Sequence, residues 1–561
     1  MKSSQHSKIK VSLLAVLFFF GWQFSEGDGR AQSRPRMQTI HPTQNVLHLA
    51  AGIIPYQSGF PRREPGAVDF SSPSVADLQG DGHLEVLVGG YGGCVWGWKA
   101  DGSLLNGYPL ISSGNRCNNE RIGGPLAIGD ADGNGQLEIA AGTRGENIAG
   151  ERGKVYVWNG ATGQLLPGWP IEMPWSSAST GPAEVTTVAL GNLAGDGNLE
   201  VMAGTTNSGG SQPTPNVLAW RLDGSWLEGF PTAHRNGGIW GAIAVADIFG
   251  DSDQELIVGR DQKQLDAYDS HGQQLPGWPV STYVDGTKTN WEQDLYIEFT
   301  YSAPSIADLD RDGAMDLIFA GKVRDPLQGG AITHYGLFVL QPDGSRRPGW
   351  EIARLAGPPL TSIYSSLQAA AVADLDGNGR SEIVMSFPDG TLRVYDDVGN
   401  ARWVFDYAQE KILLASEPVI GDINADGQVE IVFGVYSPPG ADAETSAGVA
   451  ALDANGQLLA GFPLSLTQEE SIEMAGIRAA PTLADLDGDC DVEIIAASLG
   501  GSVYVWDLPA RYYPDRMPWP TGRHDNARSG SVSGAPLFTS QCPLYHPLTR
   551  RVYLPQILHQ K

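Results

Sequence analysis

Basic residues are scarce in this chain relative to acidic ones. Its 561 residues include 37 lysines and arginines but 64 aspartates and glutamates, which gives a formal net charge of −27. Nucleic acids and anionic membrane surfaces both require a basic patch on their protein partners. The composition therefore argues against either class of partner. It is consistent with a chain that neutralises part of its charge with bound cations.

Long apolar runs are also missing, apart from one near the N-terminus. The run VSLLAVLFFFGW follows Lys2, Lys8 and Lys10 and precedes a polar stretch that contains Ala31, a plausible cleavage point. This order of segments is typical of a secretory signal peptide. The run is shorter than the roughly 20 residues that a membrane-spanning helix needs, although an uncleaved anchor is the alternative. We expect residues 1–31 to be a signal peptide and the mature protein to be secreted or extracellular, with no membrane insertion after cleavage.

Common catalytic signatures are absent. The sequence contains no H-E-x-x-H, G-x-S-x-G or P-loop motif, and its ten histidines form no cluster with metal-ligand spacing. Four cysteines occur without any C-x-x-C spacing, so a thiolate zinc site is not expected. They form an early and a late pair, and of the three possible connectivities we predict Cys94–Cys117 and Cys490–Cys542.

What the chain has instead is one motif repeated eight times. Each copy is an acidic loop between two apolar runs, and the copies begin 48 to 66 residues apart, at Asp77, Asp130, Asn192, Asp247, Asp308, Asp374, Asp422 and Asp485. A second half follows several of the loops, in which a strand, a turn and another short strand end in Gly-aromatic-Pro. Four short strands in a repeat of this length predict a β-propeller blade.

We therefore predict an all-β, eight-bladed β-propeller of four-stranded antiparallel blades over residues 47–530, with seven blades as the alternative. Residues 32–46 would be a linker and residues 531–561 a C-terminal tail, and we expect a monomer. The last repeat lacks a clear fourth strand. Residues 56–63, which contain Gly-Phe-Pro, would supply it and close the ring, which removes open sheet edges. Residues 517–530 are the competing closer, and His524 and Asp525, which look catalytic in isolation, would then serve that closure.

The acidic loops have the residue pattern of a site for a hard divalent cation. Side chains at positions 1, 3 and 5, the carbonyl of position 7 and an acid at position 9 would surround the ion with oxygen, and glycine at position 6 permits the left-handed turn. The loop is not an EF-hand, because position 12 of the fifth copy is Phe319, inside a strand. The alternative is that aspartate and asparagine merely stabilise tight turns.

Five copies have enough acids for calcium, and we expect about five structural ions. Positions 1, 3, 5, 7 and 9 are Asp130, Asp132, Asn134, Gln136 and Glu138 in the second copy; Asp308, Asp310, Asp312, Ala314 and Asp316 in the fifth; Asp374, Asp376, Asn378, Arg380 and Glu382 in the sixth; Asp422, Asn424, Asp426, Gln428 and Glu430 in the seventh; and Asp485, Asp487, Asp489, Asp491 and Glu493 in the eighth. The first copy, with Asp77, Asp81 and Glu85, is weaker because Gln79 stands at position 3. Ala194 and Phe249 remove that ligand from the third and fourth copies, and Cys490 replaces the glycine of the eighth.

The stretch DLDRDGAMDLIFAG and its siblings resemble the FG-GAP/VCBS repeats of exported propeller proteins, which are related to the integrin α-subunit head. The resemblance covers about residues 47–530. It implies that the calcium loops are structural and lie on the face opposite the usual ligand surface.

Long connections would gather on that opposite face. They contain the candidate ligand-binding aromatics Trp291, Tyr283, Tyr296, Trp175 and Trp240, whereas most tryptophans of the Gly-Trp-Pro endings would pack between blades. A propeller fold does not fix a function. We expect a non-enzymatic binding or adhesion module for an extracellular protein or glycan ligand. The alternative is a calcium-dependent polysaccharide lyase of the rhamnogalacturonan type, for which Lys288 and His334 are the candidate bases.

Overall fold

The computed structural model describes residues 54–63, 66–112, 117, 120–144, 152–174, 183–206, 213–234, 237–260, 263–299, 301–361, 369–438, 441, 447–466, 475–532, 542 and 544. All of them belong to one compact unit, Gln38–Lys561. The predicted signal peptide, the predicted linker and most of the predicted tail lie outside the described residues.

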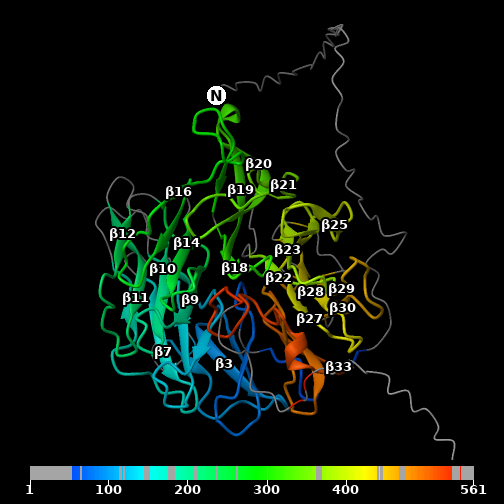
Figure 1. Cartoon of the computed structure of the whole chain (residues 1–561). Helices are drawn as coiled ribbons and strands as arrows, with labels where there is room; N and C mark the ends of the chain where they lie inside the picture. The colour runs from blue at the N-terminus through cyan, green and yellow to red at the C-terminus, as the bar shows by residue number, and fades with distance from the viewer. Residues whose placement is uncertain are drawn as a thin grey trace, which may run out of the picture. The chain divides into compact units, whose positions relative to one another are not determined.

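Eight antiparallel sheets form an eight-bladed β-propeller (Figure 1). The first four blades are β1 (Ser74–Ala76), β2 (Glu85–Gly89), β3 (Cys94–Lys99) and β4 (Leu110–Ile111); β5 (Ala127–Gly129), β6 (Glu138–Gly142), β7 (Lys154–Asn159) and β8 (Ile171–Glu172); β9 (Val185–Gly191), β10 (Glu200–Thr205), β11 (Thr214–Trp220) and β12 (Thr232–His234); and β13 (Ile243–Ala246), β14 (Glu255–Gly259), β15 (Gln264–Tyr268) and β16 (Val280–Ser281). The predicted architecture is confirmed, and the seven-bladed alternative is wrong.

The last four blades follow the same order with two additions. They are β18 (Ser305–Ala307), β19 (Asp316–Asp325), β20 (Ala331–Leu340) and β21 (Arg354–Ala356); β22 (Ala371–Ala373), β23 (Glu382–Phe387), β24 (Thr391–Tyr395) and β25 (Ala401–Asp406); β27 (Val419–Gly421), β28 (Glu430–Tyr436), β29 (Gly448–Leu452) and β30 (Leu464–Ser465); and β31 (Thr482–Ala484), β32 (Asp491–Ala497) and β33 (Val503–Arg511). The added strands β17 (Tyr296–Glu298) and β26 (Leu414–Ala415) pair with β19 and β28, and short 3-10 turns lie at η1 (Pro326–Gln328) and η2 (Pro514–Arg516).

The hydrophobic core lies mainly between neighbouring blades. One cluster contains Phe60, Val75 and Val505 and so joins the eighth blade to the first. Burying an aliphatic or aromatic side chain of this size contributes roughly 1.5–3 kcal/mol. The Gly-Trp endings add hydrogen bonds between blades, because the indole nitrogens of Trp169, Trp278 and Trp350 donate to the carbonyl oxygens of Leu222, Pro342 and Asp397 in the following blades, at 2.8, 3.1 and 3.0 Å. The predicted packing of these tryptophans between blades is confirmed.

The N-terminal part of the described chain completes the eighth blade. Gln57 N and Arg62 N donate to the carbonyl oxygens of Val505 and Val503, each at 2.9 Å, so residues 55–62 lie beside β33 as its fourth strand. Gly59 in this strand has a φ of +88°, and a Cβ atom there would lie 1.9 Å from the carbonyl oxygen of Asp101 in the first blade. Only glycine fits this approach. The ring is thus closed by strand exchange, as the sequence indicated.

Residues 517–530, the other segment that was a candidate to close the ring, do not pair with the eighth blade as its fourth strand. Residues 517–532, which we call the axial segment, run along the innermost strands (Figure 1). Backbone amides of six innermost strands donate to carbonyl oxygens of this segment at 2.7 to 2.9 Å. The pairs are Ile128–Asn526, Leu190–Ala527, Val245–Ser529, Ile306–Gly530, Ile420–Trp519 and Leu483–Pro520. Asn526 Nδ2 reaches the first blade at the carbonyl oxygen of Val75, 2.7 Å away. The expectation that this segment closes the last blade is therefore wrong. It hydrogen-bonds to seven blades at the axis instead.

Two buried arginines hold the axial segment. Arg523 and Arg528 are each 1% exposed, and their guanidinium groups donate to the carbonyl oxygens of Pro304 at 2.6 Å and Leu126 at 2.8 Å. Burial lowers the pKa of Arg528 to about 10. His524 packs edge-on against Trp519, and Asp525 accepts a hydrogen bond from Ser529 N at 3.0 Å. These contacts give His524 and Asp525 structural roles.

Both predicted disulfide pairs are present. Cys94 is joined to Cys117, and Cys490 to Cys542, so no cysteine is free. Among the described residues, the structure has no helix of the length and apolarity that a helical membrane crossing requires.

Candidate functional site

Each acidic loop joins the innermost strand of a blade to its second strand. In the second loop, Asp130 Oδ1 accepts a hydrogen bond from Asn134 N at 3.0 Å, and Glu138 Oε2 accepts one from Ala131 N at 2.9 Å. The bond from the position 2 amide to the position 9 acid recurs in the first, fourth, fifth, sixth, seventh and eighth loops. The first and ninth positions are thereby held toward a common centre.

The position 5 side chains are oriented in the same way in all five loops predicted to bind calcium. In each of them the backbone amide of position 7 donates to the position 5 side chain at 2.7 or 2.8 Å, in the pairs Gln136–Asn134, Ala314–Asp312, Arg380–Asn378, Gln428–Asp426 and Asp491–Asp489. A turn without metal forms such bonds as well. A better indication of a metal site is a set of carboxylate oxygens from different residues that lie close to one another.

Carboxylates converge in four of the five loops. One oxygen from each of three acids lies within 4.8 Å of the others in the sets Asp130, Asp132 and Glu138; Asp308, Asp310 and Asp312; Asp374, Asp376 and Glu382; and Asp485, Asp487 and Glu493. The seventh loop, with Asn424 at position 3, is not among these carboxylate sets, and neither is the first loop with Asp77, Asp81 and Glu85. The fifth set differs from the others because it lacks its position 9 acid, Asp316.

The position 9 acids are buried. Desolvation is the main cause that raises the pKa of Glu138 to about 6, of Glu382 to about 7, of Glu430 to about 8 and of Glu493 to about 9. Buried carboxylates without a cation favour the neutral form in this way. A divalent ion would reverse the preference by stabilising the charged form.

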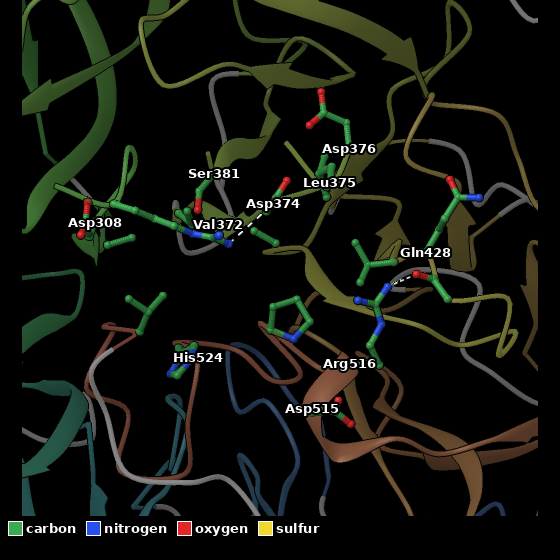
Figure 2. A pocket seen from close by; sticks show the side chains of 18 residues that line it. Asp308, Val372, Asp374, Leu375, Asp376, Ser381, Gln428, Asp515, Arg516 and His524 are labelled. Atoms are coloured by element: carbon green, nitrogen blue, oxygen red, sulfur yellow. Dashed lines mark hydrogen bonds and ion pairs between the residues drawn. The ribbon is translucent and has the colours of Figure 1, made fainter. Parts of the chain in front are cut away.

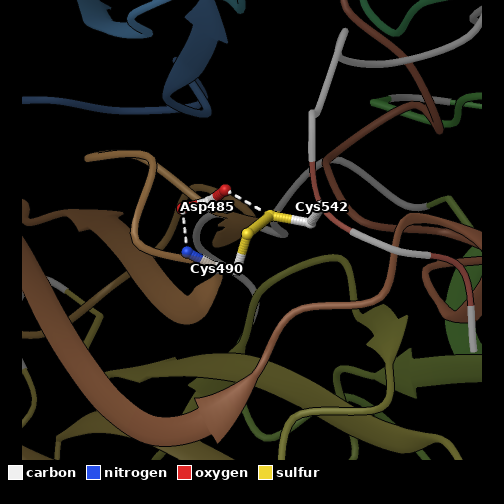
Figure 3. Close-up of side chains that lie close together, drawn as sticks. All are labelled: Asp485, Cys490 and Cys542. Carbon is white, nitrogen blue, oxygen red and sulfur yellow. Dashed lines mark hydrogen bonds between the residues drawn. A yellow bond between two sulfur atoms is a disulfide. The ribbon is translucent and has the colours of Figure 1, made fainter.

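The eighth loop has a carboxylate oxygen that nothing satisfies. Glu493 is fully buried, and its Oε1 has no hydrogen-bond partner among the described residues. At the same loop Cys490 takes the left-handed conformation with a φ of +69°, and its disulfide brings Cys542 Sγ within 2.8 Å of Asp485 Oδ2 (Figure 3). An unsatisfied buried polar group costs about 1–3 kcal/mol, and more when it is charged. In the seventh loop, the buried Asp422 Oδ1 is unsatisfied in the same way.

The fifth loop already contains a cation of its own. Arg347, which is 6% exposed, donates from Nε to Asp316 Oδ1 at 2.7 Å and lies 2.8 Å from Asp310 Oδ2 through Nη2. Its Nη1 is anchored on the carbonyl oxygen of Asp397 at 2.7 Å. Because Asp316 Oδ2 accepts from Leu309 N, both oxygens of the closing acid are occupied. Two of the four acids of this loop, Asp310 and Asp316, are thus paired with a cation that the fold supplies.

The sixth loop is intermediate between the eighth loop, where a buried carboxylate oxygen is unsatisfied, and the fifth loop, where a buried arginine pairs with the acids. Arg402 pairs with Asp376 at 2.6 Å and with Glu382 at 2.9 Å, but its side chain is 36% exposed and can move into solvent. Hard cations such as calcium take six to eight oxygen ligands in flexible geometry. The oxygen-rich second, sixth, seventh and eighth loops fit such an ion, and the fifth fits it less well.

A cavity of about 660 Å³ lies at the acidic-loop end of the axis. Figure 2 shows Asp308 and Asp374 on one side of it, and Arg516 of η2 and His524 of the axial segment on the other. Arg311 Nη2 lies 3.4 Å from Asp374 Oδ2, which connects the fifth loop to the sixth. Three of the four acids in the described lining, Asp308, Asp374 and Asp376, therefore belong to the candidate metal loops, and the fourth, Asp515, lies in η2.

A second pocket, of about 280 Å³, lies at the opposite end of the axis. Its lining includes Arg121, Arg144, Arg478, Tyr91 and Phe70. These residues precede innermost strands or follow second strands, so they belong to the face opposite the acidic loops. Asp69 forms ion pairs with Arg478 and, at 3.7 Å, with Arg144. Burial and the Asp69 carboxylate raise the pKa of Tyr91, whose hydroxyl donates to Asp69 Oδ2.

The predicted aromatics contact one another more than they face solvent. Tyr283 is 3% exposed and stacks on Trp291 with ring centres 3.9 Å apart, and Trp291 meets Tyr296 edge-on at 5.5 Å. Trp240 meets Tyr301, a residue of the pocket, at 5.9 Å. Trp175 lies outside the described residues.

Sequence reasoning missed the arginines. Arg121, Arg144 and Arg478 stand beside innermost or second strands but belong to no repeated pattern, and neither Lys288 nor His334 is in the pocket lining. No local signal in the sequence marks them, because Arg221, Arg260 and Arg511 also stand at strand ends.

The chain matches no protein family and no curated protein in sequence. In structure it is similar to the V. cholerae biofilm matrix protein Bap1, with 13% identity and a TM-score of 0.47 over 82% of this chain and 92% of that one. It is also similar to the exotype rhamnogalacturonan lyase YesX, with 17% identity and a TM-score of 0.49 over 85% and 80% of the two chains. BamB from Moraxella catarrhalis has 15% identity and a TM-score of 0.44 over 81% and 98%. At these identities and scores the similarities carry no argument about function.

Proposed function

We propose that the chain is an exported, calcium-stabilised propeller of the FG-GAP/VCBS type that binds an extracellular ligand on the face opposite its acidic loops. The observation that carries this proposal is the pocket at that end of the axis, where charged and aromatic side chains converge. Binding pockets combine apolar walls with a few polar groups that fix orientation. The ligand would be a glycan or a protein, and the ring would act as a monomer.

Calcium has a structural role in this proposal. It would occupy the second, sixth, seventh and eighth loops, and the fifth with lower affinity because Arg347 pairs with Asp310 and Asp316. An ion at 100 times its dissociation constant stabilises the folded state by about 2.7 kcal/mol. Each ion would hold the hairpin between the first two strands of its blade.

Immobilised glycans and extracellular proteins provide the test. We expect a retained ligand to be lost from an Arg121→Gln or Trp291→Ala variant. Arg311→Gln is the matched control, because Arg311 is exposed on the acidic-loop side. A ligand that is lost from the control and retained by the two variants would contradict the proposed face.

A polysaccharide lyase is the second candidate. The observation that favours it is the group of guanidinium side chains, which could neutralise a uronate carboxylate before elimination. Against it, the described residues of the pocket lining include no lysine or histidine to serve as a base, and burial and Asp69 raise the pKa of the Tyr91 hydroxyl. Incubation with acidic polysaccharides decides between the two, because a lyase produces an unsaturated, ultraviolet-absorbing end and a binding module does not.

A further inference from the structure

We propose that the pocket at the arginine end of the axis binds the carboxylate of an acidic sugar, a uronate residue. This inference rests on the proposed function and adds the chemical class of the ligand. The pocket volume of about 280 Å³ is just below the range of roughly 300–1,000 Å³ usual for small-molecule pockets. It suits one sugar ring better than a long segment of chain.

Arginines outnumber acids among the described residues at this pocket. Arg121, Arg144 and Arg478 line it together with one carboxylate, Asp69, and a second carboxylate, Glu184, lies 3.7 Å from Arg144. The described residues therefore bring more guanidinium groups than carboxylates to this pocket, in a chain whose net charge is −27. A ligand carboxylate would add the negative charge that these groups favour.

Arg144 is the group best placed to receive that carboxylate. Among the described residues its side chain makes one hydrogen bond, from Nη1 to Tyr91 Oη at 3.3 Å, and its contacts with Asp69 and Glu184 are both 3.7 Å long. Its side chain is 16% exposed, and its Nε has no hydrogen-bond partner among the described residues. A guanidinium has five donors in a fork that matches a carboxylate. Arg144 is thus largely shielded from solvent, and most of its guanidinium N–H groups make no hydrogen bond within the described part of the chain.

The remaining walls suit a sugar ring. The ring centres of Phe70 and Tyr301 lie 5.6 Å apart. The guanidinium carbons of Arg144 and Arg478 lie 5.9 and 4.2 Å from the centre of the Phe70 ring. Arg121 is exposed at the rim, 5.2 Å from the Tyr91 ring, and forms no ion pair within the described part of the chain. Aromatic faces next to fixed arginines offer a surface for C–H groups and a fork for the carboxylate.

Titration calorimetry of the full chain with D-glucuronate, its methyl ester, D-glucose and glutamate tests the inference. We expect glucuronate to bind at least about tenfold more tightly than the ester and glucose, which lack the charge, and more tightly than glutamate, which lacks the ring. Arg144→Gln and Arg121→Gln should each weaken glucuronate by at least about tenfold. Arg221→Gln, a partly exposed arginine paired with Asp196 on the third blade, should leave binding unchanged.

Equal binding of glucuronate and its ester, or of glucuronate and glutamate, would overturn the inference. If Arg144→Gln does not fold, Arg121→Gln, which changes an exposed side chain, still decides it. A neutral ligand that is lost on Trp291→Ala, with no binding of glucuronate, would refute the uronate and leave the proposed face intact. No ligand of any class on this face would refute both.

Discussion

The fifth and eighth acidic loops both have acids at positions 1, 3, 5 and 9, but the fold pairs these acids differently. In the fifth, the buried Arg347 bridges Asp310 and Asp316. In the eighth, Glu493 Oε1 is buried and has no hydrogen-bond partner among the described residues. The comparison teaches that acid count alone does not identify a calcium loop. What matters is whether the fold already supplies a cation.

The largest effect is expected from Arg347→Met. Without calcium, this change leaves Asp310 and Asp316 unpaired and should destabilise the fold by about 3–5 kcal/mol, since breaking a buried ion pair costs that much. With calcium, much of the loss should be recovered and one more ion should bind per chain. Denaturant unfolding with and without chelator measures both. An unchanged ion count, with no recovery in calcium, would show that the fifth loop cannot act as a metal site.

A smaller effect is expected from Glu493→Gln. The eighth loop should lose its ion, and stability in calcium should fall by about 3 kcal/mol. In chelator the variant should be at least as stable as the parent, because the buried carboxylate is gone. Glu255→Gln is the matched control: it is also a buried closing acid, but in the fourth loop, where Phe249 replaces a ligand. Equal calcium dependence of the two variants would contradict the distinction between the loops.

The calcium-free chain should lose stability as pH rises. The folded-state pKa values of Glu382, Glu430 and Glu493 are raised from 4.5 to about 7, 8 and 9. Between the unfolded and folded values, the folded chain binds protons that the unfolded chain has released, so stability is present at low pH and lost as pH rises. In chelator, we expect the unfolding free energy to fall by at least about 1 kcal/mol from pH 5 to pH 8. A rise over this interval would be the contrary result.

The smallest effect is expected from Arg402→Gln. Arg402 and Asp376 are each about one-third exposed, and only Glu382 is buried, so the stability cost should be small, about 1 kcal/mol. Calcium affinity at the sixth loop should increase, because a competing cation is removed. Calorimetric titration of calcium into the metal-free chain measures this change. Weaker binding would mean that Arg402 supports the ion.

The repeats made the fold predictable. The acidic loop between two apolar strands recurs eight times and the Gly-aromatic-Pro ending recurs in most copies, so each copy supports the others. The Gly-Phe-Pro at residues 59–61 marked residues 56–63 as a displaced fourth strand. The axial segment could not be predicted in the same way. It occurs once, and Arg523 and Arg528 satisfy backbone carbonyls of blades that are distant in sequence.

The candidate sites were predictable only in part. Local spacing places Asp130 and Glu138 in one loop, but nothing local shows that Arg347, 31 residues after Asp316, returns to neutralise it. The pocket arginines come from different blades and meet only when the ring closes. Tyr283 was expected to face a ligand because its connection is long, yet it is buried under Trp291.

The thermal unfolding midpoint of the full chain, measured in calcium and then in chelator, tests the central claim most directly. The account predicts a large fall on chelation that is restored when calcium is returned, since each saturated loop adds about 2.7 kcal/mol at 100 times its dissociation constant. An unchanged midpoint would contradict the account and leave the acidic loops as turns stabilised by their own hydrogen bonds.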